Sequence, residues 1–503
     1  MKESESSHRR PTLLEAIVAV AVSFACIGVG VLALGVDVHV PIVIATSFIC
    51  VIGRYLLHFQ WKEIEEGIFR GIMIGLQAIL ILMIVGMIIG AWIQGGIVPT
   101  LIYYGLSLLS PAIFLLATLL ICSIVSLATG TSWGTSGTVG LALMGIAAGL
   151  GVPAPLAAGV VISGAYFGDK MSPLSDTTNL APAVAGTTLF SHIRAMISTT
   201  MITYAIVIVI TLVIGFKFAG GTLDASRIQA FQKLLAAEFH ISLLGFIPPI
   251  VVIFLAASRF PAIPSLFAGV VLGAIMVLLQ GNGLATMVTS IHYGYTPALS
   301  AELAGAENLE AVSALLASKG ITDVSPELAK EVGQMLSDLL KRGGLDSMMW
   351  TVSLIFCALS FGGVMERCGF LEVLLDSLLR HVKSVTGLIT SVIFACIFTN
   401  IFLADQYVAI VLPGRMFKSA FDKKGLHPRM LSRTLEDSGT LTSVLIPWNT
   451  CGAYHTSLFG VPTLEYLPYA FLNYLNPFVA IALTAMGKFI FWRKDTDDDI
   501  ITK

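Results

Sequence analysis

Charged residues are scarce in this chain of 503 residues. Asp, Glu, Lys and Arg make up only 12% of the sequence, about half the share found in an ordinary soluble domain, whereas 56% of it is hydrophobic. The mean hydropathy is +0.88. This composition excludes an ordinary soluble protein and indicates an integral membrane protein. The net charge of −2 leaves no basic footprint for a nucleic-acid partner, so we expect the main partner to be the lipid bilayer.

Several catalytic and metal-binding motifs are also missing. The seven cysteines have no CxxC spacing, so neither a disulfide framework nor a zinc site is indicated. There is no GxxxxGK[ST] motif for ATP-driven pumping and no HExxH motif for zinc proteolysis. The Tyr-Asp and Gly-x-Gly-Asp motifs of intramembrane aspartyl proteases are absent as well. We therefore expect a protein that is not an enzyme and that has no cofactor.

Long apolar runs are what the sequence has in abundance. Runs of about 20 apolar residues can cross a bilayer as helices. Eight runs predict ordinary crossings, at roughly 12–34, 40–58, 71–93, 190–216, 241–257, 262–280, 346–365 and 466–491.

Four further segments are apolar but interrupted. Residues 111–150 are broken by a Gly-, Ser- and Thr-rich run at 128–137, and residues 384–421 are broken around 399–406. We expect each of these two segments to form a re-entrant hairpin. Residues 154–188 and 428–452 each carry acids near the middle, and each is predicted to be a broken helix.

The order of these segments occurs twice. We therefore predict an all-α polytopic membrane protein with two inverted repeats of five crossings, each with a re-entrant hairpin and a broken helix, an architecture common in secondary transporters. Aligning the two halves on their acids makes Asp169 equivalent to Asp437, and a two-residue insertion brings Asn179 onto Asn449. The predicted divisions are a cytoplasmic tail at 1–11, a first repeat at 12–218, an external loop at 219–240, a second repeat at 241–494 that includes an external helical linker at 282–344, and a cytoplasmic tail at 495–503.

The placement of basic residues predicts the orientation. Lys and Arg gather on the side of the two termini, and the short loops on the other side carry none. Because basic residues are enriched on the cytoplasmic side of a membrane, we expect both termini to be cytoplasmic.

The first broken helix and first hairpin hold the main candidates for an ion site. A charged group at membrane depth is costly, which makes it a functional candidate, and hard cations prefer carboxylate, hydroxyl and carbonyl oxygens. The structural alternative is that the hydroxyls and glycines only help the membrane helices to pack. The candidates are Asp169, Asp176, Asn179, Thr129, Thr131, Ser132, Thr177 and Ser172, with Na+ itself on Asp169, Asp176 and Asn179.

A carboxylate in an apolar site also binds protons, so Na+ and H+ would compete for it and one site could carry both. Lys170 lies beside these acids. It is either the charge partner of one of them or a side chain that extends to water.

The second half supplies a weaker set. These candidates, as a second site or a gate, are Asp405, Asp437, Ser438, Thr440, Asn449 and Thr450. In the alignment on the acids Asp176 falls opposite Val444, so we expect the ion chemistry to be weighted to the first half and Asp437 to brace or gate the second hairpin. Arg415 and Arg433 are expected either to mark cytoplasmic helix ends or to receive a substrate carboxylate.

Three stretches carry a family resemblance. The run Gly168-Asp-Lys-Met-Ser-Pro-Leu-Ser-Asp-Thr-Thr-Asn-Leu-Ala181, the run 128–137 and the run Gly343-Gly-Leu-Asp-Ser-Met-Met349 resemble the NhaC family of Na+/H+ antiporters, in the ion-transporter superfamily. The match extends over nearly the whole chain. The resemblance implies a multi-pass protein of a prokaryotic inner membrane, a homodimer, and a mobile part made of the hairpins and broken helices that slides like an elevator.

The leading hypothesis is thus a secondary active transporter that exchanges Na+ for H+ through a shared carboxylate site. The same resemblance covers exchangers of small organic acids, such as malate/lactate antiporters. A Na+- or H+-coupled exchanger of small carboxylates or amino acids therefore remains the alternative. The excess of acids over the single base Lys170 in the first break favours cations alone.

Overall fold

The computed structural model describes residues 8–219, 225–258, 260–380 and 382–494. Most of both predicted tails, and residues 220–224 of the predicted external loop, lie outside the described residues. Within the described ranges the chain is helical and forms no strand beyond an isolated bridge between Leu426 and Trp492. Eight helices there are long and apolar enough to cross a membrane, or nine if one bent pair is a single span. The fold is therefore that of an all-α polytopic membrane protein.

The chain begins with three membrane-length helical segments, α1 (Leu13–Gly28), α2 (His39–Val51) and α3 (Trp61–Gln94). The helix α3 packs closely against α18 (Met349–Arg367) through small residues. A Cβ atom on Gly71 would lie only 2.3 Å from the carbonyl oxygen of Leu359. Small residues of this kind let the backbones of two membrane helices approach each other.

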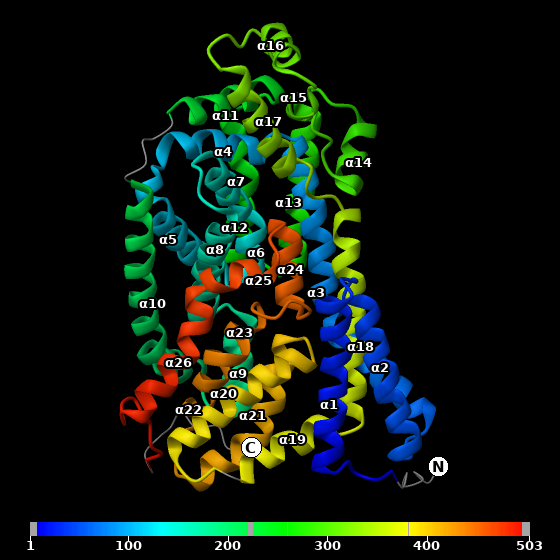
Figure 1. Cartoon of the computed structure of the whole chain (residues 1–503). Helices are drawn as coiled ribbons and strands as arrows, with labels where there is room; N and C mark the ends of the chain where they lie inside the picture. Colours follow the sequence, from blue (N-terminus) through cyan, green and yellow to red (C-terminus); the bar gives the residue numbers. More distant parts are fainter. Residues whose placement is uncertain (1–7, 220–224, 259, 381, 495–503) are drawn as a thin grey trace.

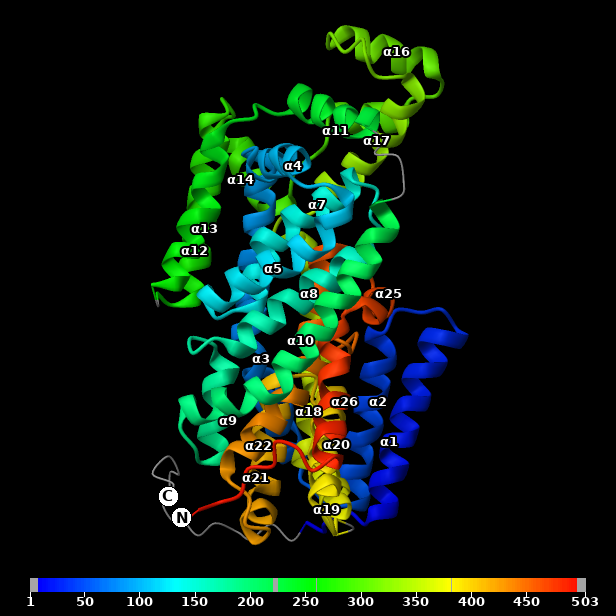
Figure 2. The same cartoon turned by 90° about the vertical axis from the view of Figure 1, so that its left-hand side faces the viewer.

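Two helical hairpins lie at opposite ends of the molecule, the first in the upper half and the second in the lower half (Figures 1 and 2). Each follows a short helix that crosses its end of the molecule, α4 (Ile97–Leu108) or α19 (Phe370–Arg380). The first hairpin comprises α5 (Pro111–Thr129), α6 (Ser132–Thr135), η3 (Ser136–Gly140) and α7 (Leu141–Gly149), and the second comprises α20 (Val385–Phe402) and α21 (Gln406–Lys423).

Each hairpin is followed by an interrupted helix. The first consists of α8 (Ala154–Met171) and α9 (Asp176–Ala185), and the second of α22 (Pro428–Leu435), η6 (Glu436–Thr440), α23 (Leu441–Ser443) and α24 (Thr450–Phe459). The second break lies at residues 444–449, beyond the acids that were expected to mark it, and the second helical part ends at Phe459 rather than at 452. A proline is found in each break, Pro173 and Pro447, and proline disfavours helix at itself and at the preceding residue.

The bounds of these elements recur in the two halves at one constant spacing. The hairpins begin at Pro111 and Val385, the interrupted helices begin at Ala154 and Pro428, and left-handed glycines end them at Gly186 and Gly460. This spacing differs from the one that aligns Asp169 with Asp437, so the predicted alignment of the halves is wrong. By the observed spacing, Asp169 corresponds to Ser443, Asp437 corresponds to Ser163, and Asn179 corresponds to Ala453. The acids of the two halves had been matched by type, whereas helix starts and caps determine the true correspondence.

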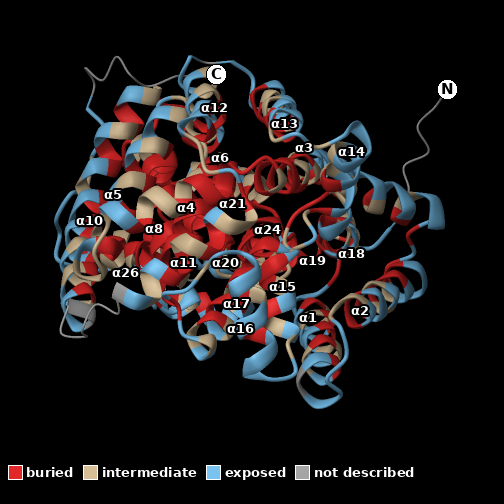
Figure 3. Cartoon of the chain, turned by 90° about the horizontal axis from the view of Figure 1, so that it is seen from above, coloured by how far each residue is buried: buried red, intermediate tan, exposed pale blue. Residues whose placement is uncertain are grey.

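The remaining helices surround this centre. Figure 3 shows that buried residues gather in the middle of the molecule, in the region of α8, α21 and α24, while exposed residues follow outer helices such as α2. The predicted linker 282–344 forms helices at the upper end of the molecule (Figure 2). The linker helices are α14 (Leu284–Tyr293), α15 (Leu299–Gly305), α16 (Leu309–Ser318) and α17 (Pro326–Leu340). The other surrounding helices are α10 (Leu189–Ala219), α11 (Ala225–Glu238), α12 (Ile247–Ala257), α13 (Ala262–Leu279), α25 (Thr463–Tyr466) and α26 (Phe471–Ala485).

Candidate functional site

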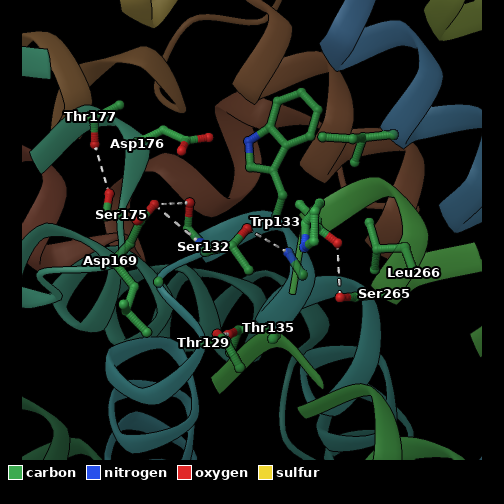
Figure 4. A pocket seen from close by; sticks show the side chains of 18 of the residues that line it. Thr129, Ser132, Trp133, Thr135, Asp169, Ser175, Asp176, Thr177, Ser265 and Leu266 are labelled. Carbon is green, nitrogen blue, oxygen red and sulfur yellow. Dashed lines mark hydrogen bonds between the residues drawn. The ribbon is translucent and has the colours of Figure 1, made fainter. Parts of the chain in front are cut away.

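The first hairpin tip, the first helix break and the second hairpin tip border one cavity of about 870 Å³. The first half contributes residues 129–135 and 173–177, together with Asp169 and Asn179. The second half contributes Asp405, Gln406, Tyr407 and Thr450. Side chains from α3, α12 and α13 complete the wall. Figure 4 shows how the polar side chains of the first half gather there.

Four helical segments begin at or beside this cavity. Their N-cap residues are Thr131, Ser175, Asp405 and Asn449, and each cap side chain accepts a hydrogen bond from a backbone N–H of its own helix. The caps form two pairs at the spacing that relates the two halves, Thr131 with Asp405 and Ser175 with Asn449. Because the N-terminal end of a helix carries a partial positive charge, this arrangement favours carboxylates at the cavity.

Asp169 connects the interrupted helix to the hairpin. It lies on the last turn of α8, and only 6% of its surface is exposed. Its Oδ2 accepts hydrogen bonds from the backbone N–H of Ser132 at 3.1 Å and from the Ser132 hydroxyl at 2.7 Å. The carboxylate thus holds the tip of the first hairpin against the helix break.

Two further carboxylates face the same cavity. Asp176 is the first residue of α9, and its side chain is exposed to the cavity (Figure 4). Asp405 is buried, and its Oδ1 accepts hydrogen bonds from the backbone N–H groups of Tyr407 at 2.8 Å and Val408 at 3.1 Å. Among the described residues that line the cavity, none is Lys, Arg or His. The charge of the cavity is therefore negative and suits a cation.

Most of the predicted neutral ligands of the first half lie at the cavity wall. Thr129 and Thr135 share a hydrogen bond between their hydroxyls at 3.4 Å, and so do Ser175 and Thr177 at 3.2 Å (Figure 4). The Thr131 hydroxyl accepts a hydrogen bond from the backbone N–H of Gly134 at 3.2 Å.

Asn179 and Ser172 brace the helix break. The amide nitrogen of Asn179 donates to the carbonyl oxygens of Pro173 at 3.0 Å and Ser175 at 2.7 Å, while the residue still lines the cavity. The Ser172 hydroxyl donates to the carbonyl oxygen of Leu127 at 2.8 Å and lies outside the cavity lining. The described residues hold no group of three His, Cys, Asp or Glu side chains placed to bind a metal ion. A cation there would therefore combine a carboxylate with neutral oxygens.

Lys170 and Asp437 form a buried ion pair outside the cavity. The Lys170 ammonium lies 2.7 Å from Asp437 Oδ1, and both side chains are fully buried. Thr199 also donates to Asp437 at 3.0 Å, and Asn476 donates at 2.8 Å. Of the two alternatives for Lys170, the structure supports the charge partner. Asp437 connects the two halves of the chain and does not line the cavity.

The other second-half candidates divide into two groups. Asp405 and Thr450 line the cavity, whereas Ser438, Thr440 and Asn449 do not. The Ser438 hydroxyl donates to the carbonyl oxygen of Thr434 at 2.7 Å, and the Asn449 amide donates to that of Asn400 at 3.0 Å. These side chains satisfy backbone groups within the helices.

Arg433 is buried inside the molecule, whereas Arg415 is exposed. Arg433 is 1% exposed and donates to the carbonyl oxygen of Phe489 at 3.0 Å. Its Nε lies 3.6 Å from Asp437 Oδ2, so it belongs to the same buried charge group.

The structure also adds cavity residues that the sequence motifs did not single out. These are Gln406 and Tyr407, next to Asp405, and Gln77 on α3. One of the cavity residues, Trp133, stacks on Tyr454 with ring centroids 4.2 Å apart. Its Nε1, however, is buried without a hydrogen-bond partner among the described residues. A lone glutamine inside the long apolar run of α3 was the available indication for Gln77.

Gly168 controls how closely Asp169 approaches the hairpin. A Cβ atom there would lie 2.4 Å from the Ser123 carbonyl oxygen and 2.5 Å from the Leu127 nitrogen, both on the backbone of α5. We expect Gly168→Ala to separate α5 from α8, to destabilise the protein by about 1–3 kcal/mol and to weaken Na+ binding. Thermal unfolding in detergent and the concentration dependence of ²²Na+ uptake would measure both. Gly305→Ala is the control, because a Cβ atom there meets nothing within 4 Å.

Comparison with known proteins identifies the family. A profile of the Na+/H+ antiporter family matches residues 164–488. The chain is 40% identical over 481 residues to the Na+/H+ antiporter NhaC of Alkalihalophilus pseudofirmus, covering 95% of this chain and 96% of that protein.

Two further relatives are named for exchange of organic substrates. The malate-2H+/Na+-lactate antiporter of Bacillus subtilis is 37% identical, with 97% of each chain covered. The arginine/ornithine antiporter ArcD of Halobacterium salinarum is 35% identical, with 96% of this chain and 94% of that protein covered. The membrane-length helices, the carboxylate-lined cavity and these matches over nearly the whole length agree. This chain is a multi-pass membrane protein that belongs to the Na+/H+ antiporter family.

Proposed function

We propose that this protein is a secondary active transporter that exchanges Na+ for H+ through the carboxylates of its central cavity. One observation carries the proposal. Three carboxylates, Asp169, Asp176 and Asp405, face a cavity whose described lining contains no basic side chain. Relatives named as Na+/H+ antiporters support the same activity.

The carboxylates suit competition between the two ions. Partial burial in a low-dielectric site disfavours the charged carboxylate, and a bound cation or the positive end of a helix favours it. Na+ that sheds its water would take a carboxylate oxygen and nearby hydroxyl or carbonyl oxygens as ligands. A proton on the same carboxyl group removes the charge that holds Na+, so binding of one ion expels the other.

The direct test uses purified protein in liposomes. With a pH indicator inside, an imposed Na+ gradient should drive proton movement in the opposite direction, and an imposed pH gradient should drive ²²Na+ uptake. Empty liposomes are the control for leak. Na+ flux that is insensitive to a pH gradient would contradict exchange and would indicate a passive channel.

We further propose elevator-type alternating access, in a homodimer in a prokaryotic inner membrane with both termini cytoplasmic. The two hairpins come from opposite ends of the molecule. Asp169 ties the tip of the first hairpin to α8, so we expect this hairpin and the interrupted helix to move as one unit. A cysteine placed at Thr131 should react with an impermeant thiol reagent from one side or the other according to the imposed Na+ gradient. Reaction from one side under every condition would contradict the proposal.

Exchange of an organic substrate is the second candidate, and the size of the cavity favours it. A volume of about 870 Å³ is in the range of small-molecule sites rather than of a bare ion. Trp133 Nε1 and Gln406 Oε1 are buried at its wall without hydrogen-bond partners among the described residues. Since no basic side chain is among the described lining, a cationic amino acid fits better than malate or lactate.

Counterflow in liposomes separates the two candidates. Liposomes loaded with unlabelled arginine should accumulate labelled arginine if amino acids are exchanged, and a parallel set loaded with malate tests carboxylates. Na+/H+ exchange without counterflow of either compound would leave cation exchange as the sole activity.

A further inference from the structure

Glu436 is a buried acid that the cavity does not use. It is the first residue of η6, and its side chain is fully buried. Neither carboxyl oxygen has a hydrogen-bond partner among the described residues. Glu436 is also absent from the cavity lining. A buried acid without a partner in a transporter calls for a physical explanation.

The protonated form is the one that this environment tolerates. An ionised carboxylate buried without hydrogen bonds costs several kcal/mol, far more than the neutral acid. The nearest available compensation is Lys170, whose ammonium interacts with Glu436 but donates its hydrogen bond to Asp437 at 2.7 Å. Charge compensation for Glu436 is therefore at hand, although it is shared with another carboxylate.

Other elements around Glu436 present few charges. Lys170 faces it from α8, the preceding Asp169 adds a negative charge nearby, and the hydroxyls of Thr177 and Thr440 lie near it without a hydrogen bond. The remaining titratable or charged groups in this region are Cys396 on α20, His192 on α10, and Arg433 and Asp437 on its own helical segment.

At the end of α8, the consecutive residues Asp169 and Lys170 point to different sides of the helix. Asp169 turns towards the cavity and the hairpin tip, whereas Lys170 turns towards Asp437 and Glu436. Thr177 stands between the two regions, since it lines the cavity, shares a hydrogen bond with Ser175 and interacts with Glu436. Thr177 is therefore the residue that lies between the cavity and Glu436.

We propose that Glu436 is a proton-binding residue separate from the cation cavity, and that it carries one proton per cycle in addition to any proton exchanged at the cavity carboxylates. The inference rests on the proposed Na+/H+ exchange. Protonation forms an O–H bond at Glu436 and leaves Lys170 to Asp437 alone. When that proton leaves, the charges of Lys170 and Arg433 together balance those of Asp437 and Glu436.

The test is the number of protons exchanged per Na+, measured in liposomes as the Na+ gradient that just balances an imposed pH gradient at a clamped membrane potential. The wild type should exchange at least two protons per Na+, and Glu436→Gln should exchange one fewer. Glu436→Asp should keep the wild-type number. Glu465→Gln removes an exposed carboxyl on α25 and is the matched control.

Exchange of ²²Na+ for unlabelled Na+ shows whether the Glu436→Gln protein is folded and binds Na+. This exchange should persist, because Glu436 lies outside the cavity. An unchanged proton number, a wild-type number of one, or loss of Na+/Na+ exchange in Glu436→Gln would each overturn the inference. Absence of proton-coupled flux in the wild type would instead overturn the proposed function.

Discussion

Asp169→Asn and Asp176→Asn are each expected to abolish Na+-dependent proton movement in liposomes. The amide has nearly the same size as the carboxylate, but it has no charge for Na+ and takes up no proton. For Asp169 the amide can still accept the hydrogen bonds from Ser132, so the hairpin contact survives. For the buried Asp169, loss of the charge corresponds to a loss of Na+ affinity of about 100-fold, or roughly 3 kcal/mol. Binding of ²²Na+ to purified protein and the pH change in liposomes would measure the two effects.

A matched control comes from the helices at the upper end of the molecule (Figure 2). Asp323 lies on an exposed loop and pairs with Lys233 there, so Asp323→Asn removes one negative charge far from the cavity. This variant should keep wild-type exchange. Wild-type exchange in both Asp169→Asn and Asp176→Asn would rule out the carboxylate mechanism, whereas loss in only one of them would identify the carboxylate that carries the ion.

Breaking the buried pair of Lys170 and Asp437 is expected to have the largest effect on stability. Each single substitution, Lys170→Met or Asp437→Leu, leaves the other charge buried without its main partner. Loss of about 3–5 kcal/mol is typical of such a change. The double variant removes both charges and replaces them with apolar side chains of similar size. It should therefore be more stable than Asp437→Leu alone, which leaves the charges of both Lys170 and Arg433 without a carboxylate, as measured by thermal unfolding in detergent.

The exposed pair of Lys233 and Asp323 is the control for this cycle. Their side chains are 35% and 70% exposed, so Lys233→Met should change the free energy of unfolding by less than about 1 kcal/mol. A double variant no more stable than Asp437→Leu would show that the pair is not the source of the effect. Arg433 and Asn476 would then be the groups that hold Asp437 in place.

Local features of the sequence predicted the helices well and the correspondence of the two halves poorly. Proline and glycine positions marked the breaks at 172–175 and at the first hairpin tip, because their backbone preferences act within a few residues. The match of Asp169 with Asp437 failed because it compared residue types. When the two halves are aligned by the first residues of their helices, the residue that corresponds to Asp169 is Ser443.

The candidate site divides along the same line. Asp169, Asp176 and the hydroxyls at 129–132 could be proposed from the sequence, because they are close along the chain and interrupt apolar segments. The place of Asp405 beside them could not, since it lies in the other half of the chain. Nor could the sequence decide between the two alternatives for Lys170.

By itself, the sequence determined that this protein lies in a membrane, where its long helices are interrupted, and which first-half acids lie at the first interruption. Apolar transfer and backbone preferences determine these features, and both act locally. Only the tertiary structure decided which charges meet: Asp405 joins Asp169 and Asp176 at the cavity, Lys170 pairs with Asp437, and Glu436 is left buried without a hydrogen-bond partner among the described residues. These contacts between residues far apart in the sequence depend on how whole helices pack, and a local sequence pattern does not predict that packing.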